Sequence, residues 1–389
     1  MEKVIRIMGY LFELFKYYLL LPIALLIYRG REIWLVSERG TDARDNGYHF
    51  YKYLRERHPE IEAYYVITED SVDKLKVEAL GNVVRYGSLQ HYLLFIAAEY
   101  KISTHNIGYV PKPYFYYRFG KYLPWKGKRI FLQHGVIKDD LKGLYAENTH
   151  LDLFICGAKP EYDHISSNFH YEDQVKYTGF ARFDALHDVV TKNQILLMPT
   201  WRMFLGNSTE HELAESDYVT KWNAVLKDAR LLAALKRHNN TMVFYPHYEV
   251  QKHYLHLFSS NDPSVVIADF DHYDVQQLLK ESELLVTDYS SVYFDFAYMK
   301  KPCVYYQFDE EDFFAGHYQR GYFDYRKMGF GEVQTDHDAL IDTIIAYLEN
   351  NCQLKEAYEK RIEGFFPLHD TNNCERIFAE IQKLGISRR

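Results

Sequence analysis

The 389-residue chain contains few cysteines, and their spacing fits neither a disulfide framework nor a zinc site. The four cysteines form no CxxC pair and lie far apart, at Cys156, Cys303, Cys352 and Cys374. Cys156 and Cys303 lie in apolar runs, which is typical of buried free thiols in a reducing cytosol. His247, His253 and His256 also match no standard zinc spacing. We therefore predict no metal site, and no cofactor.

The chain also lacks an excess of positive charge, a low-complexity tract and an internal repeat. Its 46 Lys and Arg against 54 Asp and Glu give a formal net charge of -8. This balance argues against a nucleic-acid-binding protein that works through its overall electrostatic field. A content of 47% hydrophobic and 26% charged residues indicates a globular protein, and the length suits two domains of ordinary size.

No uninterrupted apolar run is long enough to span a membrane. Residues 1–30 are strongly apolar, but the longest unbroken run, residues 17–28, has 12 residues, whereas a spanning helix needs about 20. No small-residue cleavage site follows, so a removed signal peptide is not expected. Tyr, Lys and Arg flank the run, and we predict a helix that lies in the membrane interface. A core helix of the first domain and a single tilted span are the alternatives.

After residue 30 the sequence alternates between short apolar strands and helices. Strands are expected at residues 32–37, 62–67, 82–85, 100–103, 129–133, 151–156, 241–245 and 264–267, and two more begin near residue 194 and at residue 284. One long helix is expected from Tyr218 to His238, and another near the C-terminus over residues 371–386. Such alternation predicts α/β domains with parallel sheets, here two doubly wound Rossmann-like domains with a cleft between them. The predicted parts are a membrane-interface helix (1–30), a first Rossmann-like domain (31–187), a second Rossmann-like domain (188–368) and a C-terminal helix that crosses back to the first domain (369–389).

Polar residues follow four of the expected strands. They are His134 and Gly135, then Thr200 to Arg202, then His247, and then the stretch Thr287, Asp288, Tyr289, Ser290 and Ser291. The carboxyl ends of parallel strands meet at one edge of a sheet, where ligands bind in open α/β folds. Gly135 is expected to let the backbone turn sharply beside His134.

The Ser-Ser pair precedes a predicted helix whose buried stripe is Val292, Phe296 and Met299. Ser290 or Ser291 would then be the N-cap, with free backbone N–H groups beside two hydroxyls. Such a helix start suits a phosphate or diphosphate, although a serine that only caps the helix fits the same pattern.

The segment from residue 101 to 138 contains no Asp or Glu but many basic and aromatic residues. Its basic residues include Lys112, Arg118, Lys121, Lys126, Lys128 and Arg129. We predict that this segment faces the headgroups of an anionic leaflet or lines the path of a lipid-linked acceptor. A solvated connection between strands is the plainer interpretation. Nucleic-acid binding also uses such stretches, but the apolar N-terminal segment favours a membrane.

Together these motifs resemble the CDP-glycerol glycerophosphotransferase family, whose members make the glycerol- or ribitol-phosphate parts of teichoic acids. The resemblance rests on HG after a strand, PTWR, a strand-terminal histidine, and TDYSSVYFDFA followed by KKP and an aromatic strand. The early segment ARDNGYHFYKYL resembles the family as well. The similarity extends from about Trp34 to about Phe366, and TDYSS with the downstream FD is its most specific part. It implies a GT-B fold with the acceptor on the side of the first domain (31–187) and the CDP-polyol donor in the second domain (188–368).

The resemblance also implies roles for individual residues. His134 matches the essential histidine of the first domain and is the expected general base. Positions that hold or stabilise the donor diphosphate are matched by Arg202, His247, Ser290 and Ser291, and acidic positions of the same motif by Asp288 and Asp295. Asp288 is expected to orient the loop or a ribose hydroxyl, and Asp295 to face solvent or hold His247. A histidine that is merely hydrogen-bonded in a turn is the alternative for His134.

The implied partners are CDP-glycerol or CDP-ribitol, an undecaprenyl-diphosphate-linked glycan and the cytoplasmic face of the cell membrane, where the protein would be peripheral. A homo-oligomer is a further possibility, and no nucleic acid is expected. We find no residue that distinguishes glycerol from ribitol. A nucleotide-sugar glycosyltransferase or epimerase of the same fold is a rival, and so is a non-catalytic scaffold in polymer export. The presence of both His134 and His247 argues against the scaffold.

Overall fold

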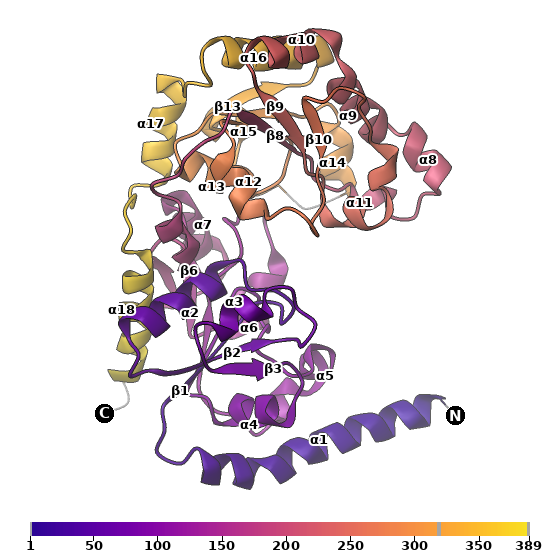
Figure 1. Ribbon diagram of the computed structural model, residues 1–389. Helices are drawn as coiled ribbons and strands as arrows, with labels where there is room; N and C mark the ends of the chain where they lie inside the picture. Colours follow the sequence, from indigo (N-terminus) through magenta and orange to yellow (C-terminus); the bar gives the residue numbers. More distant parts are fainter. Residues whose placement is uncertain (1, 317–319, 387–389) are drawn as a thin grey trace. The chain divides into compact units, whose positions relative to one another are not determined.

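The computed structural model describes residues 2–316 and 320–386, and the chain divides into two compact units, each built around one β-sheet (Figure 1). The first unit comprises Met1–His134, Lys142–Ala185 and Asp370–Arg389, and the second comprises Gly135–Leu141 and Leu186–His369. The last helix, α18 (Asn373–Ile386), belongs to the first unit, where it contacts α2, β6 and the short helix η3 (Ala181–Ala185).

The sheet of the first unit has seven parallel strands in the order β3-β2-β1-β4-β5-β6-β7. Its strands are β1 (Ile33–Ser37), β2 (Glu62–Ile67), β3 (Val83–Arg85), β4 (Tyr100–Ser103), β5 (Lys128–Phe131), β6 (Leu153–Cys156) and β7 (Val175–Tyr177). The other helices of this unit are α1 (Glu2–Ile27), α2 (Asn46–Arg57), α3 (Lys74–Glu78), α4 (Leu89–Ala97), α5 (Pro113–Phe119), η1 (Gly120–Tyr122), η2 (Lys142–Leu144), α6 (Ala146–Thr149) and α7 (Lys159–Asn168). Every residue of β1 is buried, as expected for a central strand of a parallel sheet covered on both faces.

The sheet of the second unit has six parallel strands in the order β10-β9-β8-β11-β12-β13. Its strands are β8 (Gln194–Met198), β9 (Thr241–Phe244), β10 (Val265–Ile267), β11 (Leu284–Thr287), β12 (Cys303–Tyr306) and β13 (Gly331–Gln334). Its helices are η4 (Met203–Leu205), α8 (Glu210–Glu215), α9 (Asp217–Lys227), α10 (Ala229–Arg237), α11 (Tyr248–His253), η5 (Leu255–Leu257), α12 (Val275–Glu281), α13 (Val292–Tyr298), α14 (Glu310–Gly316), α15 (Tyr325–Met328), α16 (His337–Glu349) and α17 (Glu356–Phe365). Both sheets reverse their strand order beside the first strand of the unit, which is the doubly wound topology that the sequence predicts.

Two local predictions were wrong. The single helix expected from Tyr218 to His238 is two helices, α9 and α10, because Asp228 has an extended backbone and its carboxylate accepts from the N–H groups of Arg230 and Leu231. The expected apolar stripe on α13 is not a stripe, since every side chain from residue 293 to 298 is buried. That helix is enclosed within the second unit.

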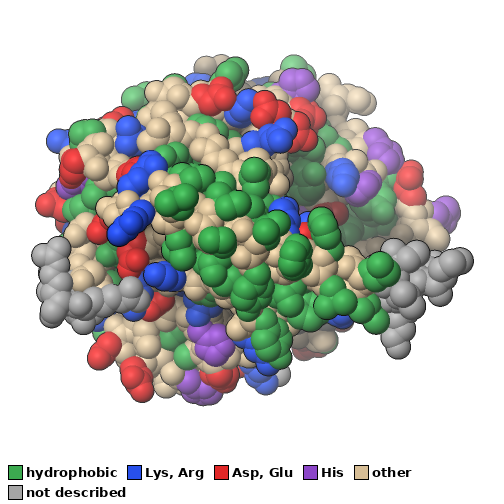
Figure 2. Space-filling view, turned by 90° about the horizontal axis from the view of Figure 1, so that it is seen from below, with side chains coloured by type: hydrophobic (Ala, Val, Ile, Leu, Met, Phe, Trp, Pro, Cys, Tyr) green, Lys and Arg blue, Asp and Glu red, His purple; other side chains and the backbone are tan. Residues whose placement is uncertain are grey.

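The N-terminal helix α1 lies along the first unit beside α4 (Figure 1). Tyr17, Leu20 and Ala24 pack into the core cluster that contains Tyr92 and Phe95 of α4. Among the side chains that the structure describes on this helix, the large hydrophobic ones that are exposed are Ile7, Met8, Leu11, Phe12, Phe15, Tyr18, Leu19, Ile23, Leu25, Leu26 and Ile27. Figure 2 shows the resulting apolar band on the face that α1 occupies. By length and composition, Ile7–Ile27 is long and apolar enough to cross a membrane.

All four cysteines are buried free thiols, as predicted.

Candidate functional site

In the first unit, His134 follows strand β5 and its side chain is exposed. Its ring stacks on His105, with 4.7 Å between the ring centroids and 5° between the ring planes. Its Nδ1 lies 3.4 Å from the carbonyl oxygen of Thr104. Because a carbonyl oxygen only accepts, Nδ1 carries the proton in this contact and Nε2 is the basic nitrogen.

His105 is itself held in one orientation. Arg39 Nε donates to His105 Nε2 over 3.0 Å, and Thr104 Oγ1 lies 3.1 Å from His105 Nδ1. Burial lowers the pKa of His105 to about 3, with further lowering by His134 and Arg39. Desolvation also lowers the pKa of His134, against an opposing effect of the Asp45 carboxylate. Both rings are therefore neutral at pH 7, the state that a general base requires.

The loop that carries His134 is anchored by Asn46, at the start of α2. Asn46 Nδ2 donates to the carbonyl oxygens of Leu132 (3.2 Å) and Gln133 (2.8 Å), and its Oδ1 accepts from the N–H of Arg182 (3.0 Å). The sharp turn is at Gln133, whose φ is +59°, and not at Gly135 as the sequence predicted. Asn46 therefore fixes the backbone next to His134.

A buried carboxyl group, that of Glu38, organises the segment before α2. Glu38 accepts from the N–H groups of Arg44 (3.0 Å), Asp45 (2.9 Å) and Tyr48 (2.8 Å). Burial raises the pKa of Glu38 to about 8, with Asp45 as a further cause, while the N–H donors act against that rise. A Cβ on Gly47 would lie 2.7 Å from Glu38 Cγ, so the backbone approaches the carboxylate too closely for any other residue. Both residues support the helix start that presents Asn46.

In the second unit, the predicted polar residues lie after three neighbouring strands. Thr200 follows β8, His247 follows β9, and the residues from Asp288 to Ser291 follow β11. Because β9, β8 and β11 are adjacent and parallel, these residues share the carboxyl edge of one sheet.

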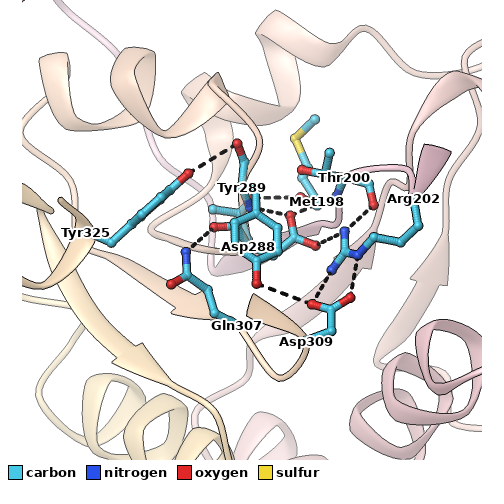
Figure 3. A network of polar contacts seen from close by, with 9 residues as sticks. Met198, Thr200, Arg202, Asp288, Tyr289, Gln307, Asp309 and Tyr325 are labelled. Carbon is cyan, nitrogen blue, oxygen red and sulfur yellow. Dashed lines mark hydrogen bonds and ion pairs between the residues drawn. The ribbon is translucent and has the colours of Figure 1, made fainter. Parts of the chain in front are cut away.

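Arg202 is not available to a ligand in this structure. Its guanidinium is fully buried and donates to Asp309 through Nε (2.6 Å) and Nη2 (3.1 Å), and through Nη1 to Asp288 (2.8 Å) and to the carbonyl oxygen of Thr200 (2.7 Å), as Figure 3 shows. Burial lowers the pKa of Arg202, but the charges of Asp288 and Asp309 outweigh this and raise it. The sequence-based expectation that Arg202 contacts the donor diphosphate directly is therefore corrected, since its donors are used by carboxylates.

The same network fixes the loop after β11. Asp288 Oδ1 accepts from the N–H of Tyr289 (2.6 Å), and the Asp288 carbonyl accepts from Gln307 Nε2 (3.0 Å). Tyr289 OH donates to Asp309 (3.3 Å), and Tyr325 OH donates to the Tyr289 carbonyl (3.4 Å), as Figure 3 shows. The buried Asp288 orients the loop, which is one of the two roles that the sequence suggested for it.

Two predicted threonines differ in their surroundings. Thr287 is buried, and its hydroxyl donates to the carbonyl oxygen of Met198 (2.7 Å) on the neighbouring strand, so it ties two strands together and does not face a ligand. The N–H of Thr200 donates to Asp288 Oδ1 (2.9 Å), whereas its buried Oγ1 has no hydrogen-bond partner among the described residues.

Ser290 and Ser291 remain accessible at the start of α13. Ser291 is exposed and Ser290 half-buried, and neither hydroxyl forms a hydrogen bond with the described residues. Ser291 occupies the N-cap position, but its side chain does not cap the helix, contrary to the capping interpretation. A Cβ on Gly135 would lie 3.2 Å from Ser291 Oγ, so Gly135 brings its segment close to this hydroxyl.

His247 and Asp295 have contrasting environments. His247 is exposed at the start of α11, where its Nδ1 accepts from the N–H of Glu249 (3.3 Å). Asp295 is buried within α13, so the expectation that it faces solvent was wrong, whereas the alternative that it holds His247 stays a prediction.

The six basic residues predicted to face a membrane or acceptor separate into two groups. Lys112 pairs with Glu13 (2.9 Å), and Lys128 pairs with Asp152 (2.7 Å). The other four form no ion pair among the described residues, and they are Arg118, Lys121, Lys126 and Arg129.

A cavity of about 320 Å³ lies in the second unit beside the buried network. Gln307 and Tyr325 belong both to its lining and to the network, and Glu310 and Arg320 add charged groups. Sequence reasoning missed Gln307, Asp309 and Tyr325. It also missed His105 and Asn46.

Comparisons with known proteins identify what the chain resembles. A family model described as CDP-glycerol:poly(glycerophosphate) glycerophosphotransferase matches residues 20–383. The chain is 34% identical over 370 residues to the minor teichoic acid biosynthesis protein GgaB of Bacillus subtilis (strain 168), covering 92% of this chain and 40% of that protein. It is 25% identical over 228 residues to the teichoic acid ribitol-phosphate polymerase TarK of Staphylococcus aureus (strain NCTC 8325 / PS 47), covering 54% of this chain and 41% of that protein. The chain thus spans less than half the length of these curated relatives.

A solved structure of the wall teichoic acid polymerase TagF, soaked with CDPG, aligns with a TM-score of 0.67 at 16% identity, covering 91% of this chain and 88% of that chain. This similarity establishes the fold, and the predicted pair of Rossmann-like domains of the GT-B type is confirmed.

Proposed function

Because the chain belongs to the CDP-glycerol:poly(glycerophosphate) glycerophosphotransferase family, we propose that it transfers glycerol phosphate from CDP-glycerol to an acceptor hydroxyl. The acceptor is a lipid-linked glycan or polyol phosphate in the synthesis of teichoic acid or a related polymer, and CMP is released. The observation that supports this most directly is the neutral, exposed imidazole of His134, held by His105 and next to a backbone anchored by Asn46.

The proposed reaction forms one bond, breaks another and moves one proton. The acceptor oxygen forms a bond to the β-phosphorus of the donor, while the bond from that phosphorus to the bridging oxygen breaks and CMP leaves. His134 Nε2 takes the proton of the attacking hydroxyl, since Nδ1 is directed to the Thr104 carbonyl. The accessible hydroxyls of Ser290 and Ser291, with His247, are assigned to the donor phosphates.

Arg202 acts indirectly in this proposal. It holds Asp288 and Asp309 and so keeps the loop from Asp288 to Ser291 in one conformation. The cavity beside Gln307 and Tyr325 offers space for part of the donor within the second unit.

The test is CMP release from CDP-glycerol and from CDP-ribitol by purified protein, with membranes and a lipid-diphosphate disaccharide acceptor. We expect acceptor-dependent CMP formation from CDP-glycerol. CMP formed only from CDP-ribitol would identify CDP-ribitol as the donor. CDP-ribitol is the second candidate because the chain is similar to a ribitol-phosphate polymerase. Turnover of UDP-sugars without CMP release from either CDP-polyol would refute the proposal in favour of a glycosyltransferase.

The protein is further proposed to bind the cytoplasmic face of the cell membrane peripherally through α1. One face of α1 is docked on the protein, and the buried carboxylate of Glu13 accepts from Lys112 and from Tyr92 OH. These contacts hold the helix along the first unit, while its opposite face is apolar and suits the boundary between headgroups and acyl chains.

Replacing Phe12 and Phe15 together by aspartate is expected to lower binding to phosphatidylglycerol vesicles by at least about 100-fold. Both rings are exposed, at 69% and 64%, and each aromatic side chain buried in lipid contributes about 1.5–3 kcal/mol. Co-sedimentation with vesicles measures the effect. The matched control is the same change at Val72 and Leu75, which are 80% and 78% exposed on the same unit. Equal losses in both double variants would exclude α1 as the membrane contact.

A further inference from the structure

The first unit contains a second cavity whose lining carries positive charge without a carboxylate. It has a volume of about 480 Å³, within the size range of small-ligand sites. Its basic lining residues are Arg118, Lys121 and Arg129, and no Asp or Glu lines it. The helices α5 and η1 form one wall, and β5 with the end of α6 forms another.

The cations of this cavity differ from the basic residues around them. Lys112 and Lys128, in the same segment, each have a carboxylate partner. Arg129 instead donates through its guanidinium to the Tyr116 hydroxyl (3.4 Å) and to the carbonyl oxygen of His150, and this guanidinium has no carboxylate partner among the described residues. Three like charges around one cavity repel each other, and an anion bound there removes that cost.

The remaining walls suit a carbohydrate. Tyr117 is exposed, and the Trp125 ring is fixed by its Nε1, which donates to the Gly120 carbonyl (3.3 Å). Aromatic faces pack against the C–H faces of sugars and polyols while leaving their hydroxyls free. The side-chain amide of Asn106 forms no hydrogen bond with the described residues and offers both a donor and an acceptor to a hydroxyl.

The cavity also lies close in sequence to the candidate base. Asn106 directly follows His105, whose ring stacks on His134. We propose that this cavity binds a phosphorylated carbohydrate, with its phosphate on Arg118 and Lys121 and its sugar against Tyr117 and Trp125. The role as acceptor subsite rests on the proposed transferase function, whereas binding itself does not.

The experiment measures binding of N-acetylglucosamine 1-phosphate to the full chain by titration calorimetry, beside N-acetylglucosamine and inorganic phosphate. We expect the sugar phosphate to bind about tenfold tighter than either part alone. Arg118→Gln and Lys121→Gln should each weaken it about tenfold, and Tyr117→Ala should remove most of the advantage over inorganic phosphate.

Arg57→Gln is the matched control, because Arg57 is an exposed cation of the same unit that does not line the cavity and forms no ion pair among the described residues. It should change the affinity less than twofold. An equal loss in Arg57→Gln, or inorganic phosphate binding as tightly as the sugar phosphate, overturns the proposal. A Lys121→Gln variant that loses affinity for phosphatidylglycerol vesicles but keeps its affinity for the sugar phosphate also overturns the proposal. In that case Lys121 would bind the anionic bilayer and not a sugar phosphate.

Failure of this proposal is distinguishable from failure of the transferase function. Sugar-phosphate binding is measured by calorimetry without any donor, and donor turnover is measured separately as CMP release. Loss of probe binding with normal CDP-glycerol turnover refutes the cavity alone. Retained, variant-sensitive binding without CMP release refutes the transferase and leaves the cavity as a carbohydrate phosphate site.

Discussion

His134→Gln is expected to reduce CMP release from CDP-glycerol by about 10²- to 10⁴-fold, the usual contribution of a general base. Glutamine keeps a polar side chain of similar reach but cannot accept the proton of the attacking hydroxyl. Affinity for CDP-glycerol should be unchanged, because the proposal places the donor on residues of the second unit. Steady-state rates and donor titration calorimetry on the same preparation separate the two effects.

The rate of CMP release should also depend on pH in a predictable direction. Desolvation lowers the pKa of His134 below its ordinary 6.5. The neutral ring is the active form, so the rate should be independent of pH above about 6.5 and fall as pH decreases through the lowered pKa. The facing groups are His105, Arg39, Asp45 and Arg182, and the pKa of His105, near 3, keeps that ring neutral across the range.

The control for His134→Gln is His170→Gln, an exposed histidine of the first unit that pairs with Glu147 (3.1 Å). The rate of this variant should lie within about twofold of the parent rate, because an exposed ion pair contributes little. A His134→Gln enzyme that retains more than a tenth of the rate would remove His134 from the role of base.

Much of the fold could be predicted from the sequence because its signals are local. The strand at Glu62–Ile67 and the strand at Tyr100–Ser103 occupy the predicted residues, and the first of them is a short, mainly apolar run. Strands β7 and β13 were missed because they are short and not uniformly apolar. The break at Asp228 depends on one side-chain cap inside an otherwise continuous helical pattern.

Only those residues of the candidate site could be predicted whose type and position in the sequence already suggest a chemical role. A histidine after a strand is such a signal, and His134 was found this way. The stacking of His105 and the anchoring by Asn46 depend on contacts between distant segments, such as the Asn46 bond to Gln133, which no local pattern contains. The burial of Arg202 is a similar case, because its partner Asp309 lies 107 residues away. In sequence, PTWR shows an arginine at a strand end but not the direction of its guanidinium.

Arg202→Met is expected to destabilise the second unit by about 3–5 kcal/mol, the range measured when one partner of a buried ion pair is removed. The change leaves Asp288, which is fully buried, and Asp309, whose side chain is 10% exposed, without their shared cation. Methionine fills the volume, so the cost arises from the carboxylates and not from a cavity. Because the two units need not unfold together, hydrogen exchange of peptides from β8 and β11 is the suitable measurement, with β1 and β4 as internal references.

The comparison with Arg230→Met makes the prediction specific. Arg202 contacts two carboxylates and Arg230 contacts three in the same unit, Asp228, Asp338 and Asp342, but Arg230 is 47% exposed. Exposed ion pairs contribute about 0–1 kcal/mol, so this variant should exchange almost like the parent. Adding Asp309→Asn to Arg202→Met should restore part of the protection, because one of the two uncompensated charges is removed. If Arg202→Met and Arg230→Met exchange alike, the buried network does not hold the loop from Asp288 to Ser291, and Arg202 must be reconsidered as a direct ligand of the donor phosphates.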